Sequence, residues 1–515
     1  MTVAFELSTR RQGIEMLARL RRRFETARGR AERFERIYFD TFDWRLWRAG
    51  ATLASSDRGR GQTLHWRRGE SAVELREPVE APPAFAWDLP PGRLRAELEG
   101  LVEMRRLLPR VELWHRSESV RLLDPRRKTV ARLRLEGWRA RSPGSKTAKR
   151  LPPRLVAVPV RGYDRDFGSL VDFLEGQSIE RVSLPVLDLA HEACGLHPGD
   201  YTAKARVTLE PELPAHLAMR RIHRRLLDTI RRNEDGLRQD LDTEFLHDFR
   251  VAVRRTRSAL TQVKGVLPLR RVRHFCAEFA WLGGRTGRLR DLDVYLLKLD
   301  DYRASLPPEV AQGLGALEEL LQGKQKSEHR RVRRVLGTRR YQRLLSEWES
   351  FLADEESPAT PPEGLAPIGR VARDRILKAH ARVIKKGRAI TPSTPEAKLH
   401  RLRIDCKKLR YLLEFFRDLY DSKQIGKVIK ALKGLQDNLG DFNDLTVQQG
   451  AMEGFAEELK EAGAPATALL ALGQLIGNLA GRHDDERSRF HEQFERFDRR
   501  KVRKRLTRLV ESAVP

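Results

Sequence analysis

Cysteine is scarce in this sequence: Cys194, Cys276 and Cys406 are the only three in a chain of 515 residues, and no two are close. An odd, dispersed set excludes a disulfide scaffold, argues against a zinc site and is typical of a reducing compartment. No stretch approaches the roughly 20 uninterrupted apolar residues of a membrane-spanning helix, and residues 1–15 lack the pattern of a signal peptide. We therefore expect a cytoplasmic protein without membrane insertion.

Negative charge is also in deficit. The chain has 72 Asp and Glu against 100 Lys and Arg, a formal net charge of +28. The hydrophobic fraction of 40% is enough for a buried core and excludes a largely disordered chain. Such a positive excess indicates an anionic partner, which could be nucleic acid, a membrane surface or a polyanionic metabolite. Arginine supplies most of it, and the planar guanidinium suits bidentate contacts with phosphate.

The chain changes character near residues 211–214. Before this point, short strand patterns between turn signals predict an α+β domain with an antiparallel sheet. After it, long amphipathic segments predict an all-α region, interrupted by a proline-rich linker at about residues 357–367. Strands are expected at residues 36–40, 63–68, 117–123, 130–138 and 155–160, and helices at residues 10–24 and about 93–108.

The helical region contains two copies of one pattern. Residues 246–257 and 399–410 each carry a histidine followed by basic residues three, seven, eight and ten positions later. Residues 287–294 and 440–447 match in the same way, and both matches have an offset of 153 residues. Two motifs in one register indicate a duplicated helical unit. The predicted domains are residues 1–205 and 211–515, and the repeat halves are about residues 211–350 and 370–510.

The repeated motif places a row of cations on each helix. At 3.6 residues per turn, Arg250, Arg254 and Arg257 share one face, and an apolar stripe lies roughly 100° away. A basic stripe is usually a solvated surface. However, residues 250–273 hold eight basic residues and no acid, and residues 373–410 hold 13 basic against 3 acidic residues. Because like charges at this spacing destabilise a helix by about 0.2–0.5 kcal/mol per pair, we interpret both rows as an anion-binding site.

The two histidines and the two aspartates of the motifs are assigned more general roles than the basic residues. His247 and His400 are expected to contact phosphate, as a cation or a hydrogen-bond donor; no metal site is expected beside them. Asp291 and Asp444 are interpreted as helix caps or as clamps for basic side chains. No catalytic residue and no cofactor is predicted.

The duplicated motif resembles the conserved-histidine α-helical domain, CHAD, from about residue 211 to the C-terminus. The resemblance implies two pseudo-symmetric four-helix bundles whose basic helices line a groove or pore. It also implies binding of inorganic polyphosphate, without turnover, and location at polyphosphate granules, where granule proteins are candidate partners. The predicted polyphosphate-binding residues are His247, Arg250, Arg254, Arg255, Arg257, His400, Arg403, Lys407, Lys408 and Arg410.

Residues 1–205 resemble a CYTH, or triphosphate-tunnel, domain, which implies an antiparallel β-barrel. Residues 38–46 match its Tyr-Tyr-Asp-Thr-x-Asp-x-x-Leu segment, and residues 204–206 resemble its closing Ser-Lys-x-x-Arg element. The carboxylates of the family's metal site are largely missing. Residues 4–8 keep only Glu6 of the opening Glu-x-Glu-x-Lys, Ala54, Ser55 and Ser56 replace an arginine pair, and residues 155–159 contain no late Glu-x-Glu.

We therefore expect the N-terminal fold without its chemistry, because Glu6 and Glu136 alone are too few to hold two metal ions. Residual anion binding by arginines of this domain is a further alternative. Two other functions stay open: a metal-dependent triphosphatase or polyphosphatase, and a non-specific nucleic-acid binder. Nucleic acid is disfavoured as a specific ligand, because the basic helices offer few aromatic side chains for base stacking. The candidate arginines for residual anion binding are Arg67, Arg116, Arg132 and Arg134.

Overall fold

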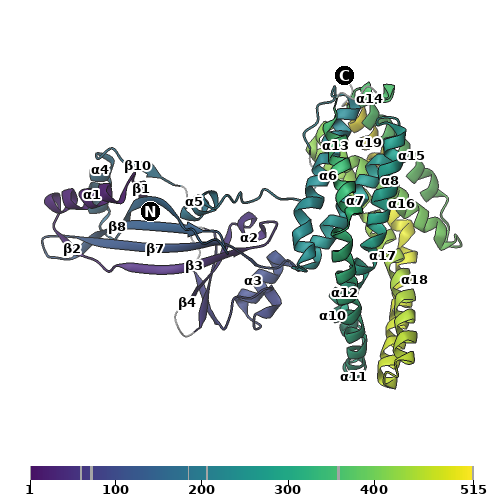
Figure 1. Ribbon diagram of the computed structural model, residues 1–515, viewed down its shortest axis with the longest axis horizontal. Coiled ribbons are helices and arrows are strands. Elements are labelled where there is room, and N and C mark those ends of the chain that lie inside the picture. Colours follow the sequence, from purple (N-terminus) through teal and green to yellow (C-terminus); the bar gives the residue numbers. More distant parts are fainter. Residues whose placement is uncertain are drawn as a thin grey trace. The chain divides into compact units, whose positions relative to one another are not determined.

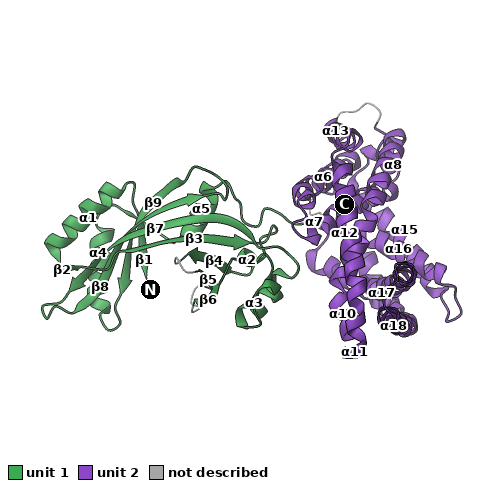
Figure 2. Ribbon diagram, turned by 60° about the horizontal axis from the view of Figure 1, so that its bottom comes forward, with its two compact units in different colours: residues 1–202 green, residues 203–515 purple. Residues whose placement is uncertain are grey.

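The computed structural model describes residues 2–57, 61–69, 74–183, 185–203, 207–355 and 360–512. The chain divides into two compact units, residues 1–202 and residues 203–515 (Figure 2). The first unit is built on a β-sheet, and the second is helical (Figure 1). None of the described helices is both long enough and apolar enough to cross a membrane.

The sheet of the first unit is antiparallel, as predicted. Its strands follow the order β10-β1-β9-β8-β7-β3-β4-β5-β6, and β2 pairs with β7. Each of the five predicted strands lies within an observed one or overlaps it closely. The strands are β1 (Val3–Glu6), β2 (Thr26–Arg28), β3 (Glu32–Asp40), β4 (Ala51–Asp57), β5 (Gln62–Arg68), β6 (Leu75–Val79), β7 (Leu108–Leu123), β8 (Thr129–Arg141), β9 (Lys149–Pro159) and β10 (Glu180–Val182).

The expected barrel is barrel-like but not closed. Among the described strands, β10 and β6 are the two ends of the pairing path, and no pairing joins them. Both edge strands are short, with three residues in β10 and five in β6, so little backbone is available for the pairing that would close the barrel. The helices of this unit are α1 (Arg10–Arg23), α2 (Arg45–Arg48), α3 (Arg93–Val102), α4 (Asp164–Glu175) and α5 (Val186–Ala193).

One face of the sheet is apolar and the other is polar over much of its length. Met16 and Leu20 of α1 and Leu170 of α4 pack with Leu133 and Leu135 of β8 in one buried cluster. Because side chains alternate along a strand, the residues between and beyond these leucines point to the opposite face. On β8, this opposite face carries Arg134 and Glu136.

Helix positions in the second unit repeat with the offset seen in the sequence. Helices α6 and α15 begin at Ala215 and Ile368, α7 and α16 at Thr243 and Glu396, and α8 and α17 at Leu269 and Ser422, each pair 153 residues apart. The helices of eight or more residues are α6 (Ala215–Arg238), α7 (Thr243–Gln262), α8 (Leu269–Arg285), α9 (Gly287–Leu297), α12 (Gly315–Leu336), α13 (Arg339–Ala353), α15 (Ile368–Arg388), α16 (Glu396–Phe415), α17 (Ser422–Glu461), α18 (Ala466–Asp498) and α19 (Arg500–Glu511).

The two halves meet along their motif helices. Helix α7 packs between α6 and α8, α16 packs between α15 and α17, and α7 and α16 contact each other. The halves differ where the first is interrupted at Thr286 between α8 and α9, whereas α17 runs unbroken for 40 residues. The predicted linker contains a short helix, α14 (Pro362–Leu365).

Candidate functional site: two facing cation rows

The first row lies on α7. This helix begins at an N-cap, Asp242, whose side chain accepts hydrogen bonds from the backbone of Glu244 and Phe245 at 3.0 and 3.3 Å. Phe249 and Val253 are fully buried and fix the apolar face against the bundle. The predicted stripe consequently faces outward, and both Arg254 and Arg257 are exposed.

The second row lies on α16 and has the same construction. Leu402, Cys406 and Leu409 are buried without exposed surface. Arg403, Lys407 and Arg410 are partly exposed on the neighbouring face. The repeated sequence therefore builds the same amphipathic helix twice.

The two rows come together at Arg254 and Lys407. Burial is the largest cause that lowers the pKa of Lys407 to about 8. The charges of Arg403, Arg254 and Arg410 lower it further, and the charge of Asp444 opposes them. Arg254 belongs to the other repeat half, so its charge reaches Lys407 across the helix pair. Neither Arg254 nor Lys407 forms an ion pair within 4.0 Å among the described residues. Cations of two helices thus lie near each other without a direct ion pair, and the charge of Asp444 offsets them only in part.

Polar contacts anchor the start of each row. Arg250 donates from Nη1 to Gly283 O at 2.9 Å and to Thr286 Oγ1 at 2.8 Å, at the interruption between α8 and α9. Burial is the main cause that lowers the pKa of Arg250 to about 10, and Arg254 adds to it. In the second half, Arg403 donates to Asp444 at 2.9 Å, so Asp444 is a clamp for a basic side chain, as expected.

Asp291 and Asp444 lie close enough to influence each other. Burial raises the pKa of Asp291, the charges of Arg250 and Arg290 oppose this, and the negative charge of Asp444 raises it again. Asp291 comes from α9 and Asp444 from α17, the equivalent positions of the two repeats. The centre of the site is therefore a pair of carboxylates beside the cations of both rows.

Two predicted residues do not lie on the rows. Arg255 donates to Ala203 O at 3.0 Å and to Glu414 Oε2 at 2.6 Å, and its guanidinium lies 5.9 Å from the ring of Tyr411. Lys408 lines a hollow between α15 and α16. Each follows its row position by one residue, which is 100° around the helix. Both residues were predicted to bind polyphosphate because they share one position of the motif. In the structure Arg255 is held by hydrogen bonds, whereas Lys408 lines a hollow.

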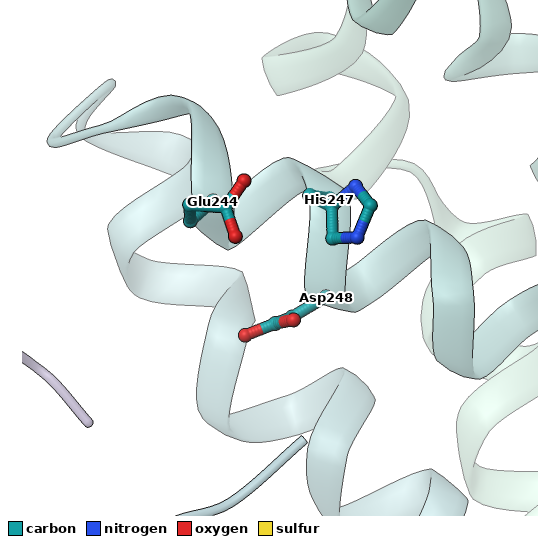
Figure 3. Close-up of side chains that lie close together, drawn as sticks. All are labelled: Glu244, His247 and Asp248. Carbon is teal, nitrogen blue, oxygen red and sulfur yellow. The ribbon is translucent and has the colours of Figure 1, made fainter. Parts of the chain in front are cut away.

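The histidines also differ between the halves. His400 is exposed and its Nδ1 hydrogen bonds with Asn443 Oδ1. His247 lies with Glu244 and Asp248 so that one potential ligand atom of each falls within 4.8 Å of the others (Figure 3). Sequence reasoning missed this cluster, although the Glu-x-x-His spacing was visible in the sequence. Arg290 lies 3.8 Å from Glu244 and competes with any cation there.

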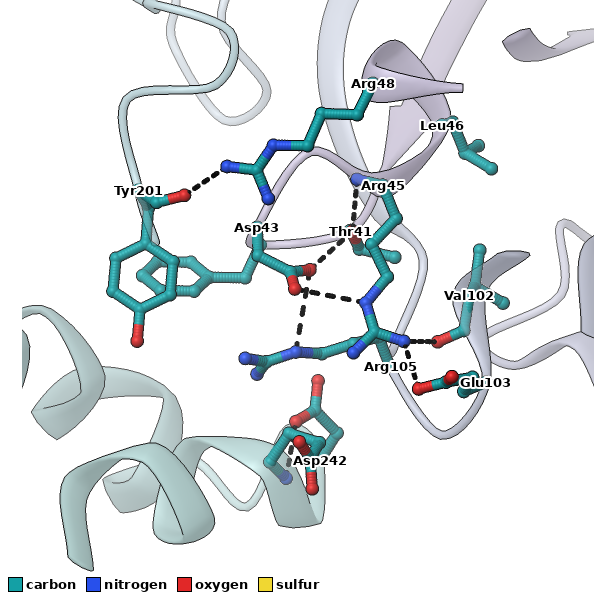
Figure 4. Close-up of polar contacts among 12 residues, drawn as sticks. Thr41, Asp43, Arg45, Leu46, Arg48, Val102, Glu103, Arg105, Tyr201 and Asp242 are labelled. Carbon is teal, nitrogen blue, oxygen red and sulfur yellow. Dashed lines mark hydrogen bonds and ion pairs between the residues drawn. The ribbon is translucent and has the colours of Figure 1, made fainter. Parts of the chain in front are cut away.

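In the first unit, the matched segment at residues 38–46 forms a hydrogen-bonded turn. Asp40 is buried, and its carboxylate accepts from the backbone of Thr41, Leu46 and Trp47 at 2.7, 2.9 and 2.8 Å. Thr41 and Arg45 both hydrogen bond with Asp43 (Figure 4). These residues have a structural role, because their polar atoms are occupied by the turn itself.

The two remaining glutamates face a guanidinium. Arg154 of β9 pairs in register with Glu6 of β1 on one side and Glu136 of β8 on the other. Arg154 is 5% exposed, and its Nε and Nη2 have no hydrogen-bond partner among the described residues. Arg134 Nε lies 3.2 Å from Glu136. A fixed positive charge therefore stands between the carboxylates that a metal ion would need.

The four arginines predicted for residual anion binding are scattered. Arg67, Arg116 and Arg132 are exposed, and strand alternation places Arg116 on the face opposite Arg134. The structure does not gather these four arginines into one site. Residues 204–206, the predicted closing element, lie outside the described residues.

A buried polar cluster on β4 to β6 was not predicted. Ser56 Oγ lies 2.7 Å from His65 Nε2, and His65 Nδ1 lies 3.2 Å from Glu74. Arg36 contacts both His65 and Glu74, at 3.2 and 3.1 Å. Burial lowers the pKa of His65, and Arg36 lowers it further. A general base must accept a proton, and the lowered pKa makes the His65 imidazole a weak base. This cluster is therefore poorly suited to general-base catalysis.

The family model of the CHAD domain matches residues 221–453. This range includes both motif helices, so the predicted family of the helical part is confirmed. The second unit contains a CHAD domain. A search of curated proteins gives no match.

Solved structures are similar to each part of the chain. The CHAD domain from the plant Ricinus communis shares 28% identity over 56% of this chain and 96% of its own, with a TM-score of 0.48. PptA from Streptomyces chartreusis shares 19% identity over 55% of this chain and 99% of its own, with a TM-score of 0.42. HpAC1 from Hippeastrum, for which a dominant triphosphatase activity is described, shares 13% identity over 39% of this chain and 99% of its own, with a TM-score of 0.26.

Proposed function

We propose that the helical unit binds inorganic polyphosphate along the cation rows of α7 and α16, without turnover. The observation that carries this proposal is the contact between α7 and α16, which brings the two rows near each other at Arg254 and Lys407. Neither residue forms an ion pair within 4.0 Å among the described residues. Two neighbouring rows suit a linear ligand that carries about one negative charge per phosphate. The direct contacts are assigned to Arg250, Arg254, Arg257, Arg403, Lys407 and Arg410, with His247 and His400 at the row ends.

Polyphosphate fits the rows better than nucleic acid does. The exposed face of the rows is made of arginine and lysine, and base binding needs exposed aromatic rings on which bases stack. Location at polyphosphate granules follows from this proposal, because a protein that binds the polymer without cleaving it accumulates where the polymer is stored.

The test is a binding titration of the full chain with long-chain polyphosphate and, at equal phosphate concentration, with DNA. Reversing both central cations, Arg254→Glu with Lys407→Glu, should weaken polyphosphate binding by about tenfold or more. The matched control is Lys423→Glu with Lys427→Glu on α17, which changes the net charge equally on exposed residues outside the rows. Equal loss in both variants, or tighter binding of DNA than of polyphosphate, contradicts the proposal.

A second candidate function concerns the polar face of the first unit. Arg154, His115 and Ser117 are at most 5% exposed there, and each has side-chain polar atoms without a hydrogen-bond partner among the described residues. Unpaired buried polar groups are costly, and an anion would satisfy those of Arg154. Binding of tripolyphosphate by the double charge-reversal variant of the helical unit, lost in Arg154→Gln, would support this candidate. Metal-dependent release of phosphate would support a triphosphatase instead.

A further inference from the structure

The second repeat half contains a hollow beside its motif helix. It lies between α15 and α16, has a volume of about 610 Å³ and is lined by Arg382, Lys385, Lys386, Ala389, Asp405 and Lys408. We call it the α15–α16 hollow. It includes Lys408, the basic residue of the second motif copy that does not lie on the central rows.

The hollow coincides with two replacements between the repeats. In the first half, Phe245 is 1% exposed and packs so closely on Gly236 that a Cβ there would lie 2.3 Å from the ring. Adding the offset of 153 gives Lys398 in place of Phe245 and Ala389 in place of Gly236. Lys398 is exposed. Without an aromatic ring between the helices, the space stays open.

The charges around this space are not balanced. Asp405 is 5% exposed, accepts from Lys386 Nζ at 2.5 Å and lies 3.7 Å from Arg382 Nη1. It neutralises one of four lining cations and holds two of them in place. Lys385 and Lys408 form no ion pair within 4.0 Å among the described residues. The hollow therefore has three positive charges in excess.

Helix stability alone does not account for this arrangement. Lys385 and Lys386 lie in the last turn of α15, where the helix dipole favours cations by about 0.3–1 kcal/mol. The same argument does not apply to Lys408 in the interior of α16. In the first half, the positions equivalent to Arg382, Lys386 and Asp405 are Thr229, Asn233 and Ala252, all buried. Arg382 and Lys386 are thus specific to the second half. Lys385 and Lys408 have arginines as equivalents, Arg232 and Arg255, but Arg255 is paired with Glu414, whereas Lys408 lines the hollow.

We propose that the α15–α16 hollow is a second binding site for condensed phosphate. This inference rests on the proposed function of the central rows and extends it. Phosphate groups match the hollow because clustered lysine and arginine donors satisfy several oxygens of one anion at once. Lys407 and Lys408 are neighbours on α16, so one helix presents cations to the central rows on one side and to the hollow on the other.

The first test compares full-length variants that lose equal charge. Lys385→Gln with Lys408→Gln should weaken binding of long-chain polyphosphate. It should also reduce the slope of log affinity against log salt by about 1.4, the contribution of two phosphate contacts. Lys423→Gln with Lys427→Gln, on exposed residues outside the hollow, should leave the slope within error of the unmodified chain. Equal slopes for the two variants overturn the proposal.

A second test fills the hollow with a side chain instead of removing the charges that line it, and it compares two variants. Lys398→Phe with Ala389→Gly restores the residues of the first half, and Lys398→Gln with Ala389→Gly removes the same charge without adding a ring. Weaker binding is expected for the phenylalanine variant only. If the phenylalanine and glutamine variants, both folded by circular dichroism, bind polyphosphate equally, the hollow is not occupied.

The failure of this inference is distinguishable from that of the proposed function. Loss of binding in the Arg254 and Lys407 variant together with unchanged binding in both sets of hollow variants keeps the central site and rejects the hollow. Titration with tripolyphosphate shows whether the phosphate groups in the hollow belong to the chain that occupies the central rows or to a separate molecule. If one chain continues from the central rows, the hollow substitutions change the affinity for long chains only. If a separate oligophosphate binds, they also remove one bound tripolyphosphate per protein. Either outcome supports a second site.

Discussion

Arg255 of α7 and Glu414 of α16 form an ion pair of 2.6 Å that joins the two repeat halves. The same carboxylate lies 3.2 Å from Arg410 Nε at the end of the second row. Glu414 therefore both connects the halves and places a negative charge beside the proposed ligand. Its equivalent in the first half is Thr261, so this acid is a feature of one repeat only.

Replacing Glu414 by Gln should separate these two roles. Loss of the charged hydrogen bond to Arg255 should lower the free energy of unfolding by about 2 kcal/mol. Removal of the competing carboxylate should tighten polyphosphate binding by about threefold. Denaturant unfolding and a binding titration measure the two effects. Weaker binding at preserved stability would mean that Glu414 does not oppose the ligand.

Binding should depend on pH through Lys407. Its pKa is lowered to about 8, so its positive charge is lost as the pH rises through about 8. Affinity for polyphosphate should fall between about pH 7 and 9. In Lys407→Arg the fall should be absent, since a guanidinium stays charged over this range. The measurement is a titration series at constant ionic strength, and identical pH profiles of the two proteins would exclude Lys407 from the contact.

Binding should also weaken steeply with salt. If several cations of the rows contact phosphates together, log affinity falls linearly with log salt concentration. Each contact removed by neutralising Arg254 or Lys407 should reduce the slope by about 0.7. Titrations at four or more salt concentrations give this slope. An affinity independent of salt would show that the basic surface is not the contact.

The sequence was sufficient for much of this architecture. The apolar period of α7 and α16 predicts both helices and both rows, because a helix that buries Phe249 or Leu402 must expose residues on its other side. The repeat offset predicts the duplication down to the starting residues of three helix pairs. These features depend on local spacing, which is written directly in the sequence.

Other features depend on contacts between distant segments and were not predictable. Arg255 and Lys408 occupy the same motif position in the two repeats. Packing between distant segments decides that Arg255 pairs with Glu414 and that Lys408 lines a hollow. The position of Arg154 between Glu6 and Glu136 needs the register of three strands. The Glu244 and His247 cluster is visible as a Glu-x-x-His spacing, but the equivalent of Glu244 in the second half is Ala397, so the repeated pattern does not mark it.

Acid should destabilise the helical unit through His223. This residue of α6 is fully buried, and neither ring nitrogen has a hydrogen-bond partner among the described residues. Burial lowers its pKa to about 3 from 6.5. The unfolded chain therefore binds the extra proton between about pH 6.5 and 3, and stability falls by up to about 1.4 kcal/mol per pH unit as the pH decreases through this range.

A His223→Leu variant tests this origin of the acid sensitivity. It lacks the titrating ring and should lose less stability than the unmodified chain between pH 6.5 and 4.5, as measured by denaturant unfolding at each pH. His400→Leu is the control, because His400 is exposed. Equal pH dependence of the His223 variant and the unmodified chain would assign the effect to other groups.

The first unit should not hydrolyse tripolyphosphate. Two divalent ions need several carboxylate ligands, and in this sheet Glu6 and Glu136 flank the buried guanidinium of Arg154, whose charge repels a cation. The full chain incubated with tripolyphosphate and Mg²⁺ or Mn²⁺ should therefore release no phosphate above the buffer control, while it still binds long-chain polyphosphate. Metal-dependent release that is abolished by Glu6→Gln would instead show that a divergent active site tolerates Arg154 between its carboxylates.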